Sequence, residues 1–164
     1  MKAIFAGSFD PPTLGHLDVI KRAAPLFEKL YVVIATNTTK QSLLKAEGRL
    51  KIFENILSGS QFSEKCEVLA FPGLVADLCS KYKIQYLVRG IRSSSDLERE
   101  IPMSIANELL SSGVTTILVP STKENAYVSS TLVREIFSLG GDISHFVPRE
   151  VLEYLEKKAK GNKK

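Results

Sequence analysis

Short apolar runs alternate with longer amphipathic segments along the whole chain. The runs are rich in β-branched residues and nearly continuous, which is typical of strands that are buried on both faces of a parallel sheet. Five such runs cover residues 2–6, 30–35, 67–71, 86–88 and 115–119. The pattern therefore predicts five parallel strands.

The segments between and after these runs carry apolar residues at helical spacing, as Leu50, Phe53 and Leu57 illustrate. They predict helices over residues 17–27, 46–57, 74–82, 96–110, 130–139 and 148–158. Ser95 and Glu98 have the spacing of a capping box that would open the fourth helix. Pro102 predicts a kink or a restart within that helix.

This alternation of strands and helices predicts an α/β fold, a single-domain, doubly wound, five-stranded parallel sheet of the Rossmann-like nucleotidyltransferase kind. A chain of 164 residues with 44% hydrophobic residues suits one such domain. We expect the domain to cover residues 1–156 and a flexible lysine-rich tail to follow over 157–164. In folds of this kind, ligands bind beyond the carboxyl ends of the strands, so the loops that follow strands hold the chemistry.

The net charge of +4 does not change this picture, because five lysines lie within the last eight residues. Without them, 17 basic residues face 18 acidic ones. The rest of the chain is therefore nearly neutral. This argues against a nucleic-acid partner, because binding nucleic acid would need a broad basic surface. No apolar run approaches the roughly 20 residues of a membrane span, so we expect no membrane association and a cytoplasmic location.

The loop after the first strand, from Gly7 to His16, predicts an anion site. Gly7 and Gly15 allow close approach of a ligand to the backbone, and a helix that starts near His16 would offer free N–H groups to a polyphosphate. A histidine at this junction can donate a hydrogen bond to charge that develops on a phosphate.

Two later segments have the same character. Val128 to Glu135 places consecutive hydroxyls at a predicted helix start, where they would cap the helix or bind nucleotide phosphates. Arg89 and Arg92 flank the end of a predicted strand and suit a bidentate phosphate clamp, although alone they would be ordinary surface charges. Lys40 follows the second strand and, taken alone, would be an exposed lysine.

The first loop resembles the GxFDPxxxGH signature of the HxGH-motif nucleotidyltransferases, with Thr13 in place of the first histidine. This TxGH form resembles the bacterial phosphopantetheine adenylyltransferase family. The hydroxyl segment resembles that superfamily's ISSxxxK/R motif, and Arg89-Gly90-Ile91-Arg92 resembles its RGxR segment. The resemblance implies an enzyme that transfers the adenylyl group of ATP to 4′-phosphopantetheine in coenzyme A biosynthesis, with Mg²⁺ and as a homohexamer.

The resemblance also implies roles for individual residues. None of these residues is expected to be a ligand to a metal ion. Catalysis would fall to His16, Lys40, Ser8 and Arg89. ATP would be bound by Ser8, Phe9, His16, Gly90, Ile91, Arg92, Glu100, Asn125, Ala126, Tyr127, Val128, Ser129, Ser130 and Thr131. The acceptor would be bound by Ser8, Lys40, Leu74, Val75, Arg89 and Asn107. Departures from the family pattern occur at Gly48, Arg99, Pro102 and Ala106.

Such a reaction needs no general base, because the attacking phosphate is already anionic at neutral pH. Two alternatives stay open at this point. One is an adenylyl- or cytidylyltransferase with another acceptor, against which Thr13 argues. The other is a non-catalytic nucleotide- or RNA-binding module that would use the lysine tail, and salt-dependent RNA retention would support it.

Overall fold

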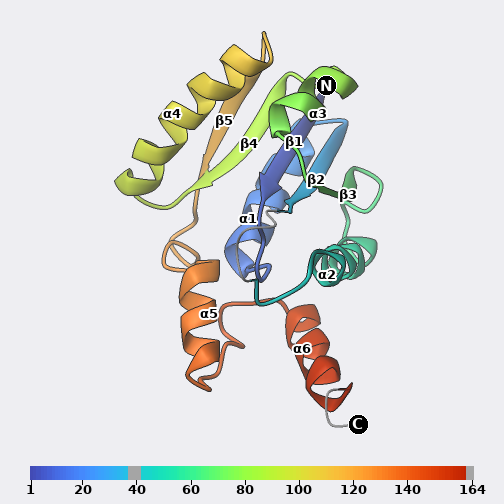
Figure 1. Ribbon diagram of the computed structural model, residues 1–164, viewed down its shortest axis with the longest axis vertical. Coiled ribbons are helices and arrows are strands. Elements are labelled where there is room, and N and C mark those ends of the chain that lie inside the picture. Colours follow the sequence, from blue (N-terminus) through green and yellow to red (C-terminus); the bar gives the residue numbers. More distant parts are fainter. Residues whose placement is uncertain (37–41, 162–164) are drawn as a thin grey trace.

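The computed structural model describes residues 1–36 and 42–161, with only the backbone described for 159–161. Strands and helices alternate along it (Figure 1). The strands are β1 (Lys2–Gly7), β2 (Lys29–Ala35), β3 (Cys66–Phe71), β4 (Tyr86–Ile91) and β5 (Thr115–Pro120). The helices are α1 (Leu14–Ala23), the 3₁₀ turn η1 (Ala24–Leu26), α2 (Ala46–Ser58), α3 (Val75–Tyr82), α4 (Ser94–Leu110), α5 (Ser130–Ser138) and α6 (Arg149–Gly161).

The five strands form one parallel sheet in the order β3-β2-β1-β4-β5, as the apolar runs predicted. The chain moves outward from β1 to β3 and then returns to β4 on the other side of β1. The connections after β1 and β4 therefore leave on opposite faces, which opens a crevice at their carboxyl ends.

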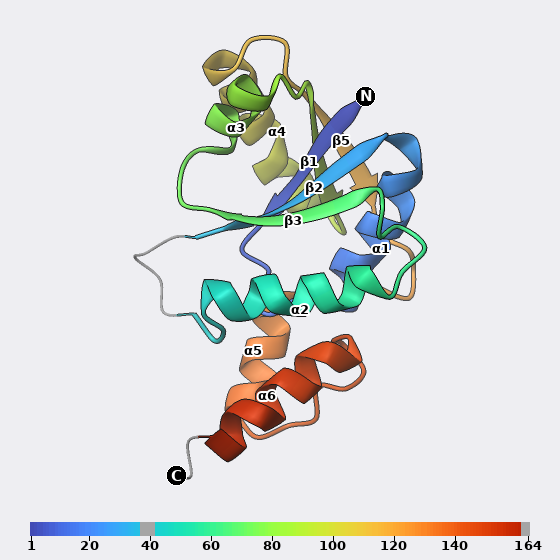
Figure 2. The same cartoon turned by 90° about the vertical axis from the view of Figure 1, so that its right-hand side faces the viewer.

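Two apolar layers cover the faces of this sheet. On one face, side chains such as Phe5 and Val32 pack with Val19 and Ile20 of α1 and Phe53 of α2. On the other face, the main contributors are Ile4, Ala6, Val33, Leu78, Cys79 and Leu87. Figure 2 shows α1 and α2 on one side of the sheet and α3 and α4 on the other. This arrangement explains why the strand sequences are apolar at successive positions instead of alternate ones.

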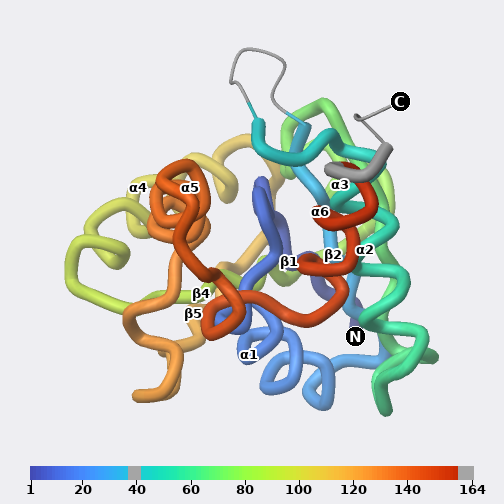
Figure 3. Tube along the Cα trace, turned by 90° about the horizontal axis from the view of Figure 1, so that it is seen from below, coloured from blue at the N-terminus to red at the C-terminus, as the bar shows by residue number. Residues whose placement is uncertain are grey.

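A third apolar cluster lies apart from the sheet and joins α2, α5 and α6. Its fully buried members include Ile52 of α2, Val133 of α5 and Val151 of α6. The view from below in Figure 3 shows α5 and α6 in front of the carboxyl ends of the strands. This cluster therefore holds the amino-terminal end of α5 near the crevice between β1 and β4.

Gly48 allows α2 and α6 to approach closely. A Cβ at this position would lie 2.7 Å from Cζ of Tyr154 and closer still to its hydroxyl oxygen. The glycine that departs from the family pattern is thus matched by a tyrosine on the facing helix.

Gly48→Ala should lower the free energy of unfolding by about 1–2 kcal/mol, because overpacking against a rigid ring outweighs the gain in helix propensity. In a Tyr154→Leu background the same substitution should instead be neutral or stabilising. Urea unfolding of the four proteins checks this, and an equal effect in both backgrounds would show that Tyr154 is not the obstacle.

The structure corrects three details of the sequence-based prediction. Helix α1 begins at Leu14 and not at residue 17, because the Thr13 side chain caps it. Helix α4 is capped by Ser93, whose hydroxyl accepts from the Asp96 N–H, so the predicted Ser95–Glu98 capping box is wrong. Pro102 lies inside α4, which continues through it, so the predicted restart is wrong, whereas the kink stays a prediction.

The predicted domain boundary at residue 156 falls inside α6, which continues to Gly161, and the division into body and tail stays a prediction. Among the helices of the described chain, none combines the length and the apolar character that crossing a bilayer requires.

Candidate active site

The loop between β1 and α1 folds around a cap that joins Thr13 and His16. The Thr13 hydroxyl accepts from the His16 backbone N–H, and the Thr13 N–H donates to Nδ1 of His16 over 3.0 Å. The Leu14 N–H donates to the carbonyl of Phe146, which ties the helix start to the segment before α6. His16 therefore lies in the first turn of α1 and not at its free end, and its own N–H is already paired.

Phe9 forms the floor beneath His16. Its backbone has a φ of 48°, a left-handed conformation that is uncommon for a bulky residue. This conformation directs the ring into the core, where it packs edge-on against Phe5, Phe53 and His16. Phe9 is consequently buried, and its role is to support the imidazole from below.

The pKa of His16 is lowered from 6.5 to about 3. Removal from water is the largest cause, and the positive charges of Arg92 and Arg89 add to it. His16 is therefore neutral at physiological pH and can act as a hydrogen-bond donor, not as a cation.

Arg89 on β4 is held in a fixed orientation. Its Nε and Nη2 each donate to a carboxylate oxygen of Glu100 over 2.7 Å, and Nη1 donates to the carbonyl of Ala6. A guanidinium has five N–H groups, so these three bonds leave two for a ligand. The structure thus presents Arg89 at the edge between β1 and β4 with spare donors.

Arg92 follows β4 and is held by Asp96 and by the carbonyl of Val128. Its Nε donates to Asp96 over 3.0 Å, and its Nη1 donates to Val128 over 3.0 Å. This side chain therefore connects the end of β4 with the segment that leads into α5.

Asp96 is the buried partner in this arrangement. Burial alone would raise the pKa of its carboxyl group, but hydrogen bonds from the side chain and backbone of Arg92, with a further bond from Arg99, outweigh it and lower the pKa. A carboxyl whose pKa falls on folding stabilises the protein above its unfolded pKa, and that contribution is lost as the pH falls through the folded value.

Asp96→Asn should therefore lower the free energy of unfolding at pH 7 by about 1–3 kcal/mol, discounted for the partial exposure of Arg92. The difference from wild type should begin to shrink below about pH 4, where the carboxyl of the unfolded chain becomes protonated, and should shrink further as the pH falls through the lower pKa of the folded state. Urea unfolding at both pH values checks this, with the exposed Asp77→Asn variant as control. A difference that does not change with pH would contradict the ion pair as its source.

The amino-terminal end of α5 contributes hydroxyls and one arginine. The Ser129 hydroxyl caps the helix by accepting from Leu132 N–H, and the Ser130 hydroxyl donates to the carbonyl of Pro11 over 2.8 Å. Arg134, one turn later, donates to the carbonyl of Asp10 and to the Thr131 hydroxyl. These bonds fasten α5 to the β1–α1 loop, so both motifs that the sequence predicts to bind phosphate face one cavity.

That cavity has a volume of about 280 Å³ and is strongly basic. Three arginines and six hydroxyl residues line it, together with His16. They are Arg89, Arg92, Arg134, Ser8, Thr13, Ser121, Ser129, Ser130 and Thr131. Gly90 also lines it, and a Cβ there would lie 2.8 Å from Val19, so glycine lets β4 lie close to α1. The arrangement suits a polyphosphate.

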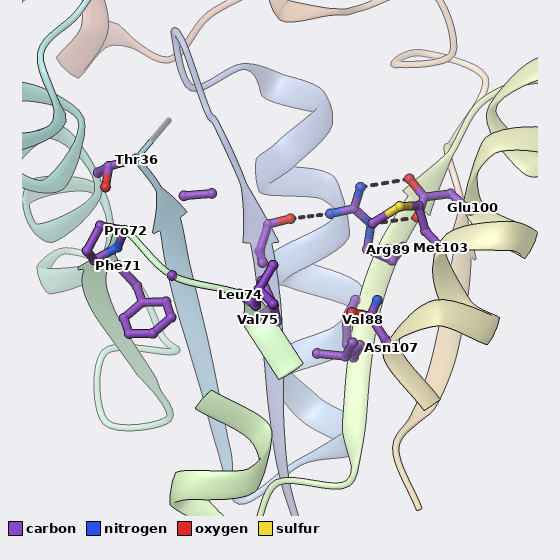
Figure 4. A pocket seen from close by; sticks show the side chains of 14 residues that line it. Thr36, Phe71, Pro72, Leu74, Val75, Val88, Arg89, Glu100, Met103 and Asn107 are labelled. Carbon is purple, nitrogen blue, oxygen red and sulfur yellow. Dashed lines mark hydrogen bonds and ion pairs between the residues drawn. The ribbon is translucent and has the colours of Figure 1, made fainter. Parts of the chain in front are cut away.

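A second, larger cavity of about 630 Å³ opens on the other side of Arg89 (Figure 4). Its walls are largely apolar and come from the carboxyl ends of β2 and β3 and from α3 and α4. Leu74, Val75, Met103 and Asn107 line it, as do Arg89 and Glu100. Ala6 and Arg89 line both cavities, so the two meet at this arginine.

Most of the residues predicted for the site lie on one of these two cavities. The basic cavity has Ser8, Phe9, His16, Gly90, Arg92 and Val128 to Thr131. The apolar cavity has Leu74, Val75 and Asn107, with Arg89 shared between the two. Glu100, predicted as a nucleotide contact, lines the apolar cavity and pairs with Arg89.

Four other predicted nucleotide contacts, Ile91, Asn125, Ala126 and Tyr127, are not on the cavity walls. Lys40 lies outside the described residues. Arg134 was missed as a site residue, although its position four residues after Ser130 places it on the same helix face. Thr13, noticed only as a replacement for histidine, is the residue that holds His16.

In the part of the chain that the structure describes, no three histidine, cysteine or acidic side chains come together in a cluster that could hold a metal ion.

The model of the cytidylyltransferase-like family matches residues 4–136, which makes the chain a nucleotidyltransferase, and the doubly wound sheet with a basic cavity at its switch point agrees with that class. The chain belongs to the phosphopantetheine adenylyltransferase family. It is 40% identical over 156 residues to the phosphopantetheine adenylyltransferase of Coxiella burnetii, covering 95% of this chain and 96% of that protein. It is 41% identical over 154 residues to that of Helicobacter pylori, covering 94% and 96%. For the Crocosphaera subtropica protein the identity is 43% over 155 residues, covering 94% and 97%.

Solved structures agree on the fold. The nicotinic acid mononucleotide adenylyltransferase of Plasmodium falciparum, complexed with APC, matches with a TM-score of 0.72 at 18% identity, covering 96% of this chain and 95% of that one. The same protein complexed with NaAD gives a TM-score of 0.71, also at 18% identity, with the same coverage. At this identity the likeness is one of fold alone.

Proposed function

We propose that the protein transfers the adenylyl group of ATP to the phosphate of 4′-phosphopantetheine, giving dephospho-coenzyme A and pyrophosphate. The observation that carries this proposal is the meeting of the two cavities at Arg89. One cavity suits the phosphates of ATP, and the other suits a long arm with apolar and amide groups that ends in a phosphate. Family membership supports the same reaction.

On the nucleotide side, Ser8, Phe9, Gly90 and Arg92 would bind ATP together with residues 128–131, and Arg134 would add a third guanidinium. His16 would donate to the oxygens of the α-phosphate as negative charge develops there. Ile91, Glu100 and residues 125–127 were predicted as further nucleotide contacts, and for Glu100 we now propose that it orients Arg89.

On the acceptor side, Leu74, Val75 and Asn107, which line the apolar cavity, would contact the pantetheine arm, and Asn107 would bind an amide group. Ser8, Lys40 and Arg89 would orient the attacking phosphate. That oxygen is anionic at neutral pH, so positioning and charge stabilisation account for the chemistry without a general base.

Mg²⁺ is the cation we propose for the reaction. The residues on the basic cavity supply hydroxyls and guanidinium groups, and among the described residues that line it none is a carboxylate. This donor set fits a metal that is held mainly by ATP phosphates and water, and the arginines would bind the phosphate oxygens that the metal leaves free. When bound, the metal would neutralise charge on the departing pyrophosphate.

We also propose a homohexamer in the cytoplasm. Support for assembly comes from α4, where Leu97, Ile101, Ile105 and Leu109 form a strip along one helix face and are 36%, 49%, 54% and 83% exposed. Such a strip is typical of a surface that another protein covers. Sedimentation equilibrium would give the number of subunits.

The direct test is Mg²⁺-dependent pyrophosphate release from ATP with a panel of acceptors. Phosphopantetheine should support turnover, whereas pantetheine, whose hydroxyl has no base to deprotonate it, should be inert. Turnover with nicotinamide mononucleotide and none with phosphopantetheine would overturn the proposed acceptor. Equal turnover with pantetheine would overturn the mechanism without a base.

A further inference from the structure

The side chain of His16 makes its only polar contacts in the described chain with Thr13. Nδ1 lies 3.0 Å from the backbone nitrogen of Thr13 and 3.0 Å from its hydroxyl oxygen. Thr13 is 1% exposed, so water does not compete for these groups. The other edge of the ring, with Nε2, is left for the basic cavity that His16 lines.

The contact with the backbone determines which nitrogen carries the proton. A backbone N–H can only donate, so Nδ1 must accept and must be unprotonated. The single proton of a neutral imidazole then lies on Nε2. The Thr13 hydroxyl can donate to the same Nδ1 lone pair, which strengthens this tautomer.

The charges around the His16 ring also favour the neutral imidazole. Arg89 and Arg92 come from β4 and the segment after it, and Arg134 of α5 lines the same cavity. On α1, the acidic residue Asp18 lies two positions after His16, and its carboxylate accepts a hydrogen bond from the Thr122 N–H. Positive neighbours disfavour an imidazolium, in agreement with the lowered pKa of His16.

We propose that Thr13 is a positioning residue for the transfer reaction: its N–H and hydroxyl hold Nδ1 of His16 and so present Nε2–H to the nucleotide phosphate as a neutral donor. This inference rests on the proposed function. It gives the TxGH form of the motif a physical role, since threonine supplies at this position both the helix cap and the group that orients the catalytic ring.

Thr13→Val and Thr13→Ser form a matched pair, because valine keeps the shape of threonine without its hydroxyl and serine keeps the hydroxyl. Thr13→Val should lower kcat about 5- to 10-fold, the equivalent of one hydrogen bond, with little change in KM for ATP. Thr13→Ser should retain kcat within about twofold, since serine caps helices as well as threonine does. Assays well below the unfolding midpoint of each variant separate this loss from the lower stability that a missing cap causes.

A second measurement does not depend on activity. The chain has two histidines, so ¹⁵N-histidine labelling in a His145→Gln background leaves one imidazole to observe. In the parent the ¹⁵N shifts of His16 should report a protonated Nε2 and an unprotonated Nδ1, unchanged from pH 5 to 8. Thr13→Val keeps the backbone N–H but loses the hydroxyl and the helix cap that hold this N–H against Nδ1, so its shifts should move part of the way toward a mixture of tautomers, and those of Thr13→Ser should not.

A protonated Nδ1 in the parent, titration of His16 within this range, or identical shifts and kcat in both Thr13 variants would each overturn the role of Thr13. If the parent shows the Nε2–H tautomer but no turnover with phosphopantetheine, the proposed function fails while the positioning of His16 stands.

Discussion

His16→Ala should reduce kcat for adenylyl transfer by about 10²- to 10³-fold, the usual cost of removing one donor to developing negative charge. The affinity for ATP should change little, because in the proposed site the arginines and the amino-terminal end of α5 would bind the ground-state phosphates without it. Steady-state assays measure kcat, and calorimetric titration with ATP in the absence of acceptor measures the affinity for ATP separately.

Two controls sharpen this expectation. His145→Ala removes the other histidine, which is exposed and away from both cavities, and should keep normal kcat. His16→Gln keeps an N–H donor and should lose less than alanine does. Near-normal kcat in a folded His16→Ala variant would remove this side chain from the mechanism.

Arg89→Met should lower kcat/KM for phosphopantetheine by about 10²- to 10³-fold, or roughly 3–4 kcal/mol. Arg89 borders both cavities, and three of its N–H groups are fixed by Glu100 and Ala6, so its remaining donors are preorganised for a phosphate at the junction. Methionine keeps much of the apolar stem and removes the charge.

Comparing the affinities for phosphopantetheine and pantetheine isolates the contribution of Arg89 to phosphate binding. Wild type should bind phosphopantetheine more tightly than pantetheine, and in Arg89→Met that preference should largely disappear while pantetheine affinity stays similar. Glu100→Gln, which leaves the guanidinium in place with a weaker acceptor, should show an intermediate preference. An undiminished preference in Arg89→Met would assign phosphate recognition to other residues.

The fold could be predicted from sequence because the strands are buried on both faces. Such strands have continuous apolar runs, so all five were found. Helix starts were less predictable, since several hydroxyl residues compete for each cap. At α4, Ser93 and Ser95 are both suitable by sequence, and only the path of the chain after β4 selects Ser93.

The motifs identified the loops of the site but not the partners of their side chains. Arg89 and Glu100 are eleven residues apart, and their pairing depends on how α4 crosses beside β4. Sequence could not show that this pairing places Glu100 on the apolar cavity. Likewise, the Thr13–His16 contact needs the backbone geometry of the first helical turn, which residue types alone do not specify.

The third apolar cluster has a consequence for how mutations would appear in assays. The amino-terminal end of α5 contributes to the basic cavity, yet Val133 anchors this helix to Ile52 and Val151, away from the sheet. A smaller side chain in place of Val151 would leave a cavity in this cluster. Helix α5 could then change position while the sheet remains folded. The resulting protein would look like a nucleotide-binding mutant, although the altered side chain touches no ligand, and compensating changes would arise in the helices that share this small core.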